Sequence, residues 1–383
     1  KFNMIKKKIP FNKAYFSNKE ILNIKKITKL NHFSSNGNFT KKCESWLIKK
    51  LKCRDALLVH SCTAALEMCA LLLNIKQNDE IILPSYAYVS SANAFALRGG
   101  KPVFVDIDPD TCNIDPKKIE KAITKKTKAI VVIHYAGISC DMESIAKIAK
   151  KNKLFLIEDA AHAILSTYKN RPLGSIGDLA TLSFHETKNI HCGEGGALLI
   201  NNPIFTKRAK ILRDKGTNRD LFNKNLVKKY SWVDLGSSYG LSEINAAFLY
   251  AQLLKSNQIT NKRRLLFNEY HNSLIKLENL GLIKRPKIKK DSIYNGHIYY
   301  IHILKKKRKK IISYLKKNNI NSVFHYIPLH SSPFGKKISQ KKMEMNNTKL
   351  ISKNILRLPI YYELKISDVK NICKYIKSFY KLK

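Results

Sequence analysis

Short apolar runs alternate with amphipathic helical patterns between Ala56 and Ile200, and this rhythm limits the possible folds more than any other feature of the sequence. Short apolar runs bounded by polar or turn-forming residues are typical of buried strands. Helical spacing of apolar residues separates them, for example in Thr63–Leu73, Ser90–Leu97 and Met142–Lys150. Strands that alternate with helices form a mostly parallel sheet covered by helices, so we predict an α/β fold. The predicted strands are Ala56–Val59, Glu80–Leu83, Pro102–Val105, Ala129–Ile133, Leu154–Ile157, Ala180–Phe184 and Ala197–Ile200.

The pattern changes after Gly236. Residues Ser242–Leu277 have helical periodicity throughout, and the remainder mixes lysine-rich helices with short strands such as Ile298–Ile303. We therefore predict a large domain over residues 1–255 and a smaller α+β domain over residues 256–383.

The chain is strongly basic, with a formal net charge of +43 at pH 7. Such a charge attracts nucleic acids and anionic membranes whatever the fold. The excess is mostly lysine, however, spread over the whole chain beside abundant isoleucine and asparagine, as an AT-rich genome produces at tolerant surface positions. Because no DNA-binding module accompanies the charge, we expect no nucleic-acid partner. A non-catalytic basic binding protein stays open as an alternative, which salt-dependent DNA binding would favour.

The eight cysteines are scattered singly, without the spacing of a disulfide framework or a zinc site. This usage fits a reducing cytoplasm, and we expect no metal. The basic start lacks the apolar segment of a secretory signal, and no stretch approaches the roughly 18 apolar residues of a membrane span. We therefore expect a cytoplasmic protein that does not insert into a membrane.

Lys188 stands in the most informative segment, SFHETKNIHCGEGG (183–196), where a predicted strand is followed by a glycine-rich turn. A lysine that bonds to an aldehyde needs an accessible neutral amine, and partial burial provides one. The nearby glycines let the backbone pass close to a bulky ligand. An ordinary hairpin with an exposed lysine is equally consistent with this sequence, so both interpretations stay open here.

A second segment, LFLIEDAAH (154–162), is an apolar strand that ends in two acids and a histidine. Ligands of open α/β sheets bind at the carboxyl ends of the strands, where Glu158 and Asp159 lie. A buried carboxylate there could keep a pyridine nitrogen protonated. The alternative is that the two acids cap a following helix.

Two more strand ends carry candidate ligand-binding residues. Ser61, Thr63 and Ala64 open a predicted helix whose free amides could bind a phosphate, with the Ser183 hydroxyl nearby, although plain helix capping has the same geometry. Tyr88 follows another strand, and its ring could stack on a flat cofactor or simply pack. All of these positions fall at ends of one predicted sheet.

The four elements, in this order and spacing, resemble the DegT/DnrJ/EryC1/StrS family of sugar aminotransferases, a branch of the fold-type I enzymes that use pyridoxal 5'-phosphate (PLP). The likeness covers nearly the whole chain, and FHETKN (184–189) and GEGG (193–196) are its most specific pieces. It implies a mostly parallel seven-stranded sheet flanked by helices and a smaller α+β C-terminal domain. Within the family, segments 61–68, 184–189, 214–219 and 324–330 are most similar to the members that make dTDP-4-amino-4,6-dideoxygalactose.

The resemblance assigns roles to the candidate residues. It implies that Lys188 bonds to PLP and moves protons, that Asp159 pairs with the pyridine nitrogen, and that the amides of Thr63 and Ala64 and the hydroxyl of Ser183 bind the phosphate.

The other assignments include two departures from the family. Tyr88 matches the ring that stacks on PLP, whereas His162 stands where many members carry a glutamine that contacts the ring hydroxyl. Ser238 stands where many members carry an asparagine that reaches the phosphate in the neighbouring subunit. The family therefore implies a homodimer with shared active sites.

The implied reaction moves an amino group from glutamate to the C4 keto carbon of dTDP-4-keto-6-deoxyglucose, for surface polysaccharide synthesis. Arg219, His325 and Tyr326 are candidates for binding the sugar nucleotide. A C3 keto sugar or a UDP- or GDP-linked sugar stays open as the substrate. The dehydratases of this fold replace the lysine with histidine, and Lys188 argues against that activity.

Overall fold

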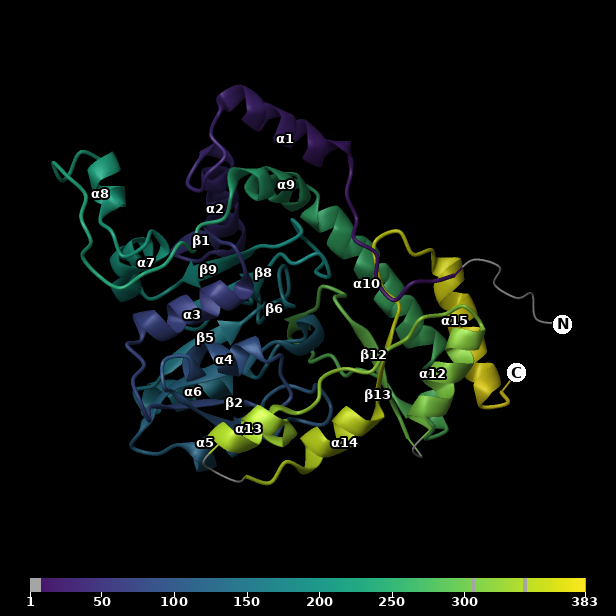
Figure 1. Ribbon diagram of the computed structural model, residues 1–383. Coiled ribbons are helices and arrows are strands. Elements are labelled where there is room, and N and C mark those ends of the chain that lie inside the picture. Colours follow the sequence, from purple (N-terminus) through teal and green to yellow (C-terminus); the bar gives the residue numbers. More distant parts are fainter. Residues whose placement is uncertain (1–7, 305–306, 340–342, 383) are drawn as a thin grey trace.

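The computed structural model describes residues 8–304, 307–339 and 343–382. A seven-stranded sheet forms its centre (Figure 1), with the spatial order β1 (Asp55–Val59), β9 (Gly196–Ile200), β8 (Leu179–Ser183), β5 (Phe155–Asp159), β4 (Thr127–Ile133), β2 (Glu80–Pro84) and β3 (Lys101–Val105). Strand β9 is antiparallel to both of its neighbours, and the other pairs in the sheet are parallel. These pairings confirm the predicted mostly parallel sheet. Every predicted strand is present, and its ends differ from the prediction by at most two residues.

Helices cover both faces of this sheet. One face packs on α2 (Asn38–Leu51), α5 (Pro116–Ala122), α6 (Met142–Lys151) and α9 (Glu243–Leu254), and α1 (Asn18–Leu30) lies against α9. The other face packs on α3 (Cys62–Leu72), α4 (Ser90–Ala96) and α7 (Thr206–Arg213). Successive strand residues point to opposite faces, so Leu57 lies in one core and Leu58 in the other.

The C-terminal part has its own core around a three-stranded antiparallel sheet. Its strands are β10 (Ile283–Lys284), β12 (Tyr299–Ile303) and β13 (Ile355–Leu358), and its helices are α10 (Ser256–Ser273), α11 (Ile275–Asn279), α12 (Arg308–Lys317), α13 (Pro333–Ile338), α14 (Asn346–Asn354) and α15 (Ile366–Phe379). The N-terminal Ile9 pairs with Ile320 and packs in this core. A further small sheet joins β6 (Thr167–Tyr168), β7 (Arg171–Pro172) and β11 (Ser292–Ile293).

The helical stretch predicted over Ser242–Leu277 is divided into α9, α10 and α11. Helix α9 packs on the large sheet, whereas α10 belongs to the C-terminal core, and the break between them lies at Lys255. The division into domains at residues 255 and 256 coincides with this break and stays a prediction. No helix in the described ranges combines the length and the apolar character that crossing a bilayer requires.

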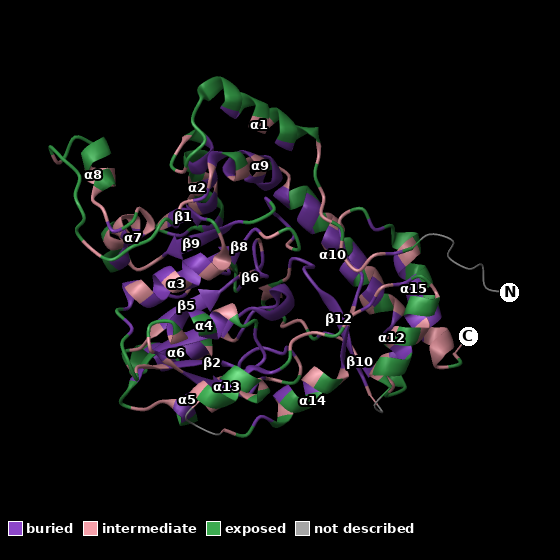
Figure 2. Cartoon of the chain, viewed as in Figure 1, coloured by how far each residue is buried: buried purple, intermediate pink, exposed green. Residues whose placement is uncertain are grey.

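Residues 219–235, which we call the α8 arm, project from the body of the molecule (Figure 1). They begin with α8 (Arg219–Asn223), and most of their side chains are exposed (Figure 2). The arm returns to the body through an ion pair between Asp234 and Arg208, whose Oδ2 and Nε atoms are 2.7 Å apart. Large apolar side chains of the arm are exposed to solvent, with Trp232 79% and Leu226 67% exposed.

Candidate active site

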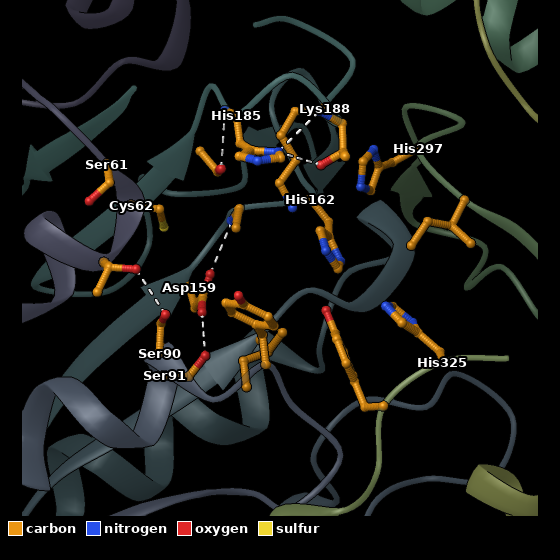
Figure 3. A pocket seen from close by; sticks show the side chains of 18 of the residues that line it. Ser61, Cys62, Ser90, Ser91, Asp159, His162, His185, Lys188, His297 and His325 are labelled. Atoms are coloured by element: carbon orange, nitrogen blue, oxygen red, sulfur yellow. Dashed lines mark hydrogen bonds between the residues drawn. The ribbon is translucent and has the colours of Figure 1, made fainter. Parts of the chain in front are cut away.

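The carboxyl ends of β5 and β8 and the starts of α3 and α4 open onto one cavity of about 640 Å³ (Figure 3). That volume lies within the range of roughly 300–1,000 Å³ that is typical of small-molecule sites. The residues predicted from the sequence that line it are Thr63, Tyr88, Asp159, His162, Ser183, Lys188, His325 and Tyr326. The four sequence elements therefore meet in one pocket.

Lys188 lies on the loop between β8 and β9. Backbone hydrogen bonds close the loop, from Phe184 N to Gly195 O (2.8 Å) and from Glu186 N to Gly193 O (2.7 Å), and Lys188 N donates to His185 O (2.9 Å). The Lys188 side chain lines the cavity, where burial lowers its pKa and the charge of Arg357 lowers it further, against the opposing effects of Cys62 and Asp159. The structure thus favours a pocket lysine over the exposed hairpin lysine.

Asp159 is the last residue of β5 and is 5% exposed. Its Oδ2 accepts a hydrogen bond from Ser91 Oγ (2.6 Å), and its Oδ1 accepts one from Ala161 N (3.1 Å). A turn rather than a helix follows the strand, so the helix-capping alternative is wrong. These contacts hold an acceptor-rich carboxylate in the pocket, on a different wall from Lys188 (Figure 3).

Glu158, the neighbouring acid, does not line the pocket because alternate strand residues face opposite sides. Its carboxylate accepts hydrogen bonds from His134 Nε2 (2.9 Å) and from the amides of Gly174 (2.8 Å), Ile176 (2.6 Å) and Gly177 (2.7 Å). Burial raises the pKa of Glu158, but these donors outweigh it and hold the pKa below its usual value. Glu158 therefore has a structural role, in binding the loop after β7.

The start of α3 has free backbone donors. Ser61 caps the helix through its Oγ, which accepts from Ala64 N (3.0 Å), so the predicted amide of Ala64 is already bonded and Ala64 itself lies behind the pocket wall. The amides of Cys62 and Thr63 have no acceptor within the helix. Gly196 passes close to this turn, since a Cβ there would lie 2.5 Å from Cys62 N. The turn is therefore a compact cup of backbone donors, and the Ser183 side chain also lies on the pocket wall.

His162 is buried beside two other histidines, with ring centroids 4.6 Å from His297 and 6.4 Å from His325. Burial lowers the pKa of His162 well below its usual value, and the charge of Lys188 adds to this effect. Its Nδ1 accepts a hydrogen bond from Ala136 N (3.3 Å). A neutral imidazole that accepts at Nδ1 carries its hydrogen at Nε2, so His162 is a hydrogen-bond donor there.

Aromatic side chains line another part of the pocket. The rings of His325 and Tyr326 stack with centroids 3.6 Å apart, and Tyr135 Oη and His325 Nδ1 are hydrogen-bonded at 2.6 Å. Tyr88 is 59% exposed and lies 6.2 Å from the ring of Tyr326. Tyr88 thus stands at the mouth of the pocket, and its stacking role stays a prediction.

Two of the predicted residues lie away from this pocket. Arg219 is at the start of the α8 arm, where its guanidinium lies 5.7 Å from the ring centroid of Tyr230. Ser238 is exposed, and its backbone forms an isolated antiparallel β-bridge with Asp214. Neither lines the cavity of its own chain, and their predicted roles stay predictions.

The sequence interpretation missed pocket residues from outside the four elements. They include residues from the N-terminal segment and the C-terminal part: Phe11, Asn12, Arg263, His297 and Arg357. For Arg357 one signal was present, a single arginine within the apolar strand sequence ILRL (355–358). Phe11 and Asn12 lie in the segment IPFN (9–12), which also resembles the family, whereas no local pattern separates Arg263 and His297 from surface residues.

The pocket suits PLP on three physical grounds. The cup at α3 offers unpaired amides to a phosphate, the Lys188 amine has a lowered pKa and lines the pocket, and the Asp159 carboxylate is buried and fixed. His162 adds a donor for an oxygen on the ring.

Comparison with known proteins agrees with this chemistry. The model of the DegT/DnrJ/EryC1/StrS aminotransferase family matches residues 15–377. The chain is 38% identical to protein MJ1066 of Methanocaldococcus jannaschii, with 89% of this chain and 90% of that one covered. It is 34% identical to the spore coat polysaccharide biosynthesis protein SpsC of Bacillus subtilis, with 86% of each covered.

Solved structures give the same result. The PLP form of Spr1654 from Streptococcus pneumoniae superposes with a TM-score of 0.89 at 26% identity, covering 97% of this chain and 98% of that one. The expected fold class and cofactor are thereby confirmed. The chain belongs to the DegT/DnrJ/EryC1/StrS aminotransferase family, whose cofactor is pyridoxal phosphate.

Proposed function

We propose that this enzyme transfers the amino group of glutamate to the C4 keto carbon of dTDP-4-keto-6-deoxyglucose, giving 2-oxoglutarate and dTDP-4-amino-4,6-dideoxygalactose. The observation that carries the transfer chemistry is the meeting of Lys188 and Asp159 in one pocket. The sugar rests on the likeness of segments 61–68, 184–189, 214–219 and 324–330 to enzymes that make this product. The name of SpsC, a polysaccharide biosynthesis protein, supports a role in surface polysaccharide synthesis.

The residues that would hold the cofactor follow from the pocket. The α3 cup with Thr63, and the Ser183 hydroxyl, would bind the phosphate, while Asp159 would pair with the pyridine nitrogen. The Nε2 donor of His162 would contact the ring oxygen, replacing the glutamine of many relatives. When bound, PLP withdraws electrons from the carbon that exchanges the amino group. For the amide of Ala64 to join the phosphate, the Ser61 hydroxyl must release it.

Lys188 would act as the acid and base. Its lowered pKa increases the fraction of neutral amine near pH 7, and a neutral Nζ can take the proton from Cα of glutamate. In the second half of the reaction, the protonated Nζ would deliver a proton to the sugar carbon that receives the amino group.

The active form would be a homodimer in the cytoplasm. The α8 arm exposes Trp232 and Leu226, and large apolar side chains in the open are typical of protein interfaces. An arm that inserts into a second subunit would bring Arg219 toward the sugar nucleotide of that subunit, and Ser238 toward its phosphate. Within the pocket, His325 and Tyr326 would contact the sugar nucleotide. The eight cysteines are unpaired, which suits a reducing compartment.

The substrate is tested by product analysis. The PLP-loaded enzyme is incubated with glutamate and, in parallel, with 4-keto and 3-keto sugars linked to dTDP, UDP or GDP. Formation of dTDP-4-amino-4,6-dideoxygalactose at the highest kcat/KM supports the proposal, with Lys188→Ala as the inactive control. Preference for a 3-keto sugar or another nucleotide refutes the substrate but leaves the transfer chemistry in place.

A further inference from the structure

Arg357 is a pocket residue whose guanidinium has no hydrogen-bond acceptor among the residues that the structure describes. It lies in β13 between core residues, with Leu356 and Leu358 fully buried, while its own side chain lines the cavity. Its Nε is buried and has no hydrogen-bond acceptor, and no ion pair or side-chain hydrogen bond joins Arg357 to any residue in the described ranges. A buried N–H donor left unpaired costs free energy, so the half-buried side chain of Arg357 suits a ligand that supplies the acceptor.

Arg263, the other arginine of the pocket, shows what a structural arginine looks like here. Its Nε donates to Gly296 O (3.1 Å), and its Nη2 donates to His297 O (2.8 Å) and Ile360 O (3.0 Å). Through these three hydrogen bonds the guanidinium of Arg263 links the backbone at residues 296–297 to the backbone at residue 360. Arg357 makes no such contacts, although both side chains line the same cavity.

The surroundings of Arg357 orient its guanidinium and leave its N–H donors available to a ligand. The guanidinium carbon lies 4.7 Å from the ring centroid of Phe11, a stacking contact that orients the group without using its N–H donors. The acids that line the pocket are Asp159, already bonded to Ser91, and Glu194, which pairs with His185 at 3.5 Å. Neither acid neutralises Arg357.

We infer that Arg357 binds the α-carboxylate of the amino-acid donor. This inference rests on the proposed function and names the residue that recognises its first substrate. The α-carboxylate is attached to the same carbon that gives its proton to Lys188, so it must lie in the cavity that Lys188 and Arg357 share. The planar fork of arginine matches a carboxylate in a bidentate pair. In the sugar nucleotide, the sugar ring separates the diphosphate from C4. When C4 lies near Lys188, the diphosphate therefore lies farther out, toward the pocket mouth near Tyr88.

The test separates the two substrates. Arg357→Gln, Arg357→Lys and the control Arg54→Gln, an exposed arginine outside the pocket, are loaded with PLP, and loading is checked by the absorbance of the bound cofactor. Conversion of bound PLP to pyridoxamine phosphate by glutamate is followed in single-turnover mode, and dTDP binding is measured by calorimetry. We expect Arg357→Gln to lower the efficiency of the glutamate step about 100-fold, as the loss of a charge-assisted pair predicts. We expect dTDP binding to change by less than about twofold, Arg357→Lys to recover part of the glutamate efficiency, and Arg54→Gln to match the unmodified enzyme.

A binding readout that needs no turnover keeps the two proposals apart. Calorimetry with 2-oxoglutarate on the pyridoxamine phosphate form should show binding that Arg357→Gln abolishes. If this binding depends on Arg357 but no amino sugar forms, the inference stands and the proposed function falls. Unchanged use of glutamate by Arg357→Gln, or an equal loss of dTDP binding, overturns the inference and leaves the proposed function standing.

Discussion

Ser91 Oγ donates a hydrogen bond of 2.6 Å to Asp159 Oδ2, and it links the start of α4 to the end of β5 inside the pocket. Ser91 is 1% exposed and lies on the pocket wall, so this bond is part of the interior of the site. We predict that Ser91→Ala weakens PLP binding about tenfold, because the carboxylate loses a charge-assisted bond that orients it. Equilibrium titration with PLP measures the change, and an affinity equal to that of the unmodified enzyme would show that Ser91 does not position Asp159.

Glu158 and Asp159 are a matched pair of neighbouring acids with different expected effects. Asp159→Asn should remove transamination with little loss of stability. Glu158→Gln should lower the melting temperature at pH 7, because four donors lose their charged acceptor, while bound PLP is retained. The reverse pattern, an active Asp159→Asn enzyme, would contradict the assignment of the two acids.

The lowered pKa of Glu158 also predicts a pH dependence. A carboxyl group with a lower pKa in the folded state stabilises the protein above its unfolded pKa of about 4.3, and the stabilisation is lost as the pH falls through the folded value. The unmodified enzyme should therefore lose more stability than Glu158→Gln between pH 7 and acid pH. Thermal unfolding of the two proteins across this range measures the difference, and parallel curves would contradict it.

Gly196 lets β9 pass against the cup at the start of α3. A Cβ there would lie 2.5 Å from Cys62 N, and backbone atoms do not yield as side chains do. We predict that Gly196→Ala destabilises the protein by about 1–3 kcal/mol and weakens PLP binding at least tenfold. The control is Gly281→Ala, at a positive φ with open space around it, which should lose stability but keep its PLP affinity. Equal PLP affinities would mean that the cup does not bind the phosphate.

A shared active site can be tested by mixing inactive subunits. If Arg219 serves the neighbouring subunit, a heterodimer of Lys188→Ala and Arg219→Ala chains has one site with both residues intact. Activity should then return when the two variants are co-expressed, although each alone is inactive or severely impaired. No recovery from a heterodimer isolated with two affinity tags would show that Arg219 acts within its own chain or not at all.

The large sheet and the pocket motifs were predictable because local chemistry carries them. Buried strands such as β4 are apolar along their whole length, and residues at the carboxyl ends of parallel strands meet at one edge. That rule brought Lys188 and Asp159 together from the sequence alone.

The far wall of the pocket was not predictable in the same way. Arg357 and His297 enter from the C-terminal part, and their place depends on how that part packs on the large sheet. The predicted domain boundary falls at Lys255, but the break in the helix there was missed because α9 and α10 have continuous helical periodicity, and only tertiary packing divides them. The roles proposed for Arg219 and Ser238 involve a second chain, and the structure of one chain does not contain that contact.

The covalent attachment of PLP tests the central claim most directly. The PLP-loaded enzyme is reduced with borohydride, digested and examined by mass spectrometry, with Lys188→Ala treated in parallel. We predict one phosphopyridoxyl adduct on the peptide that contains Lys188 and none in the variant. An unmodified Lys188 in a fully loaded enzyme, or an adduct on another lysine, would contradict the account.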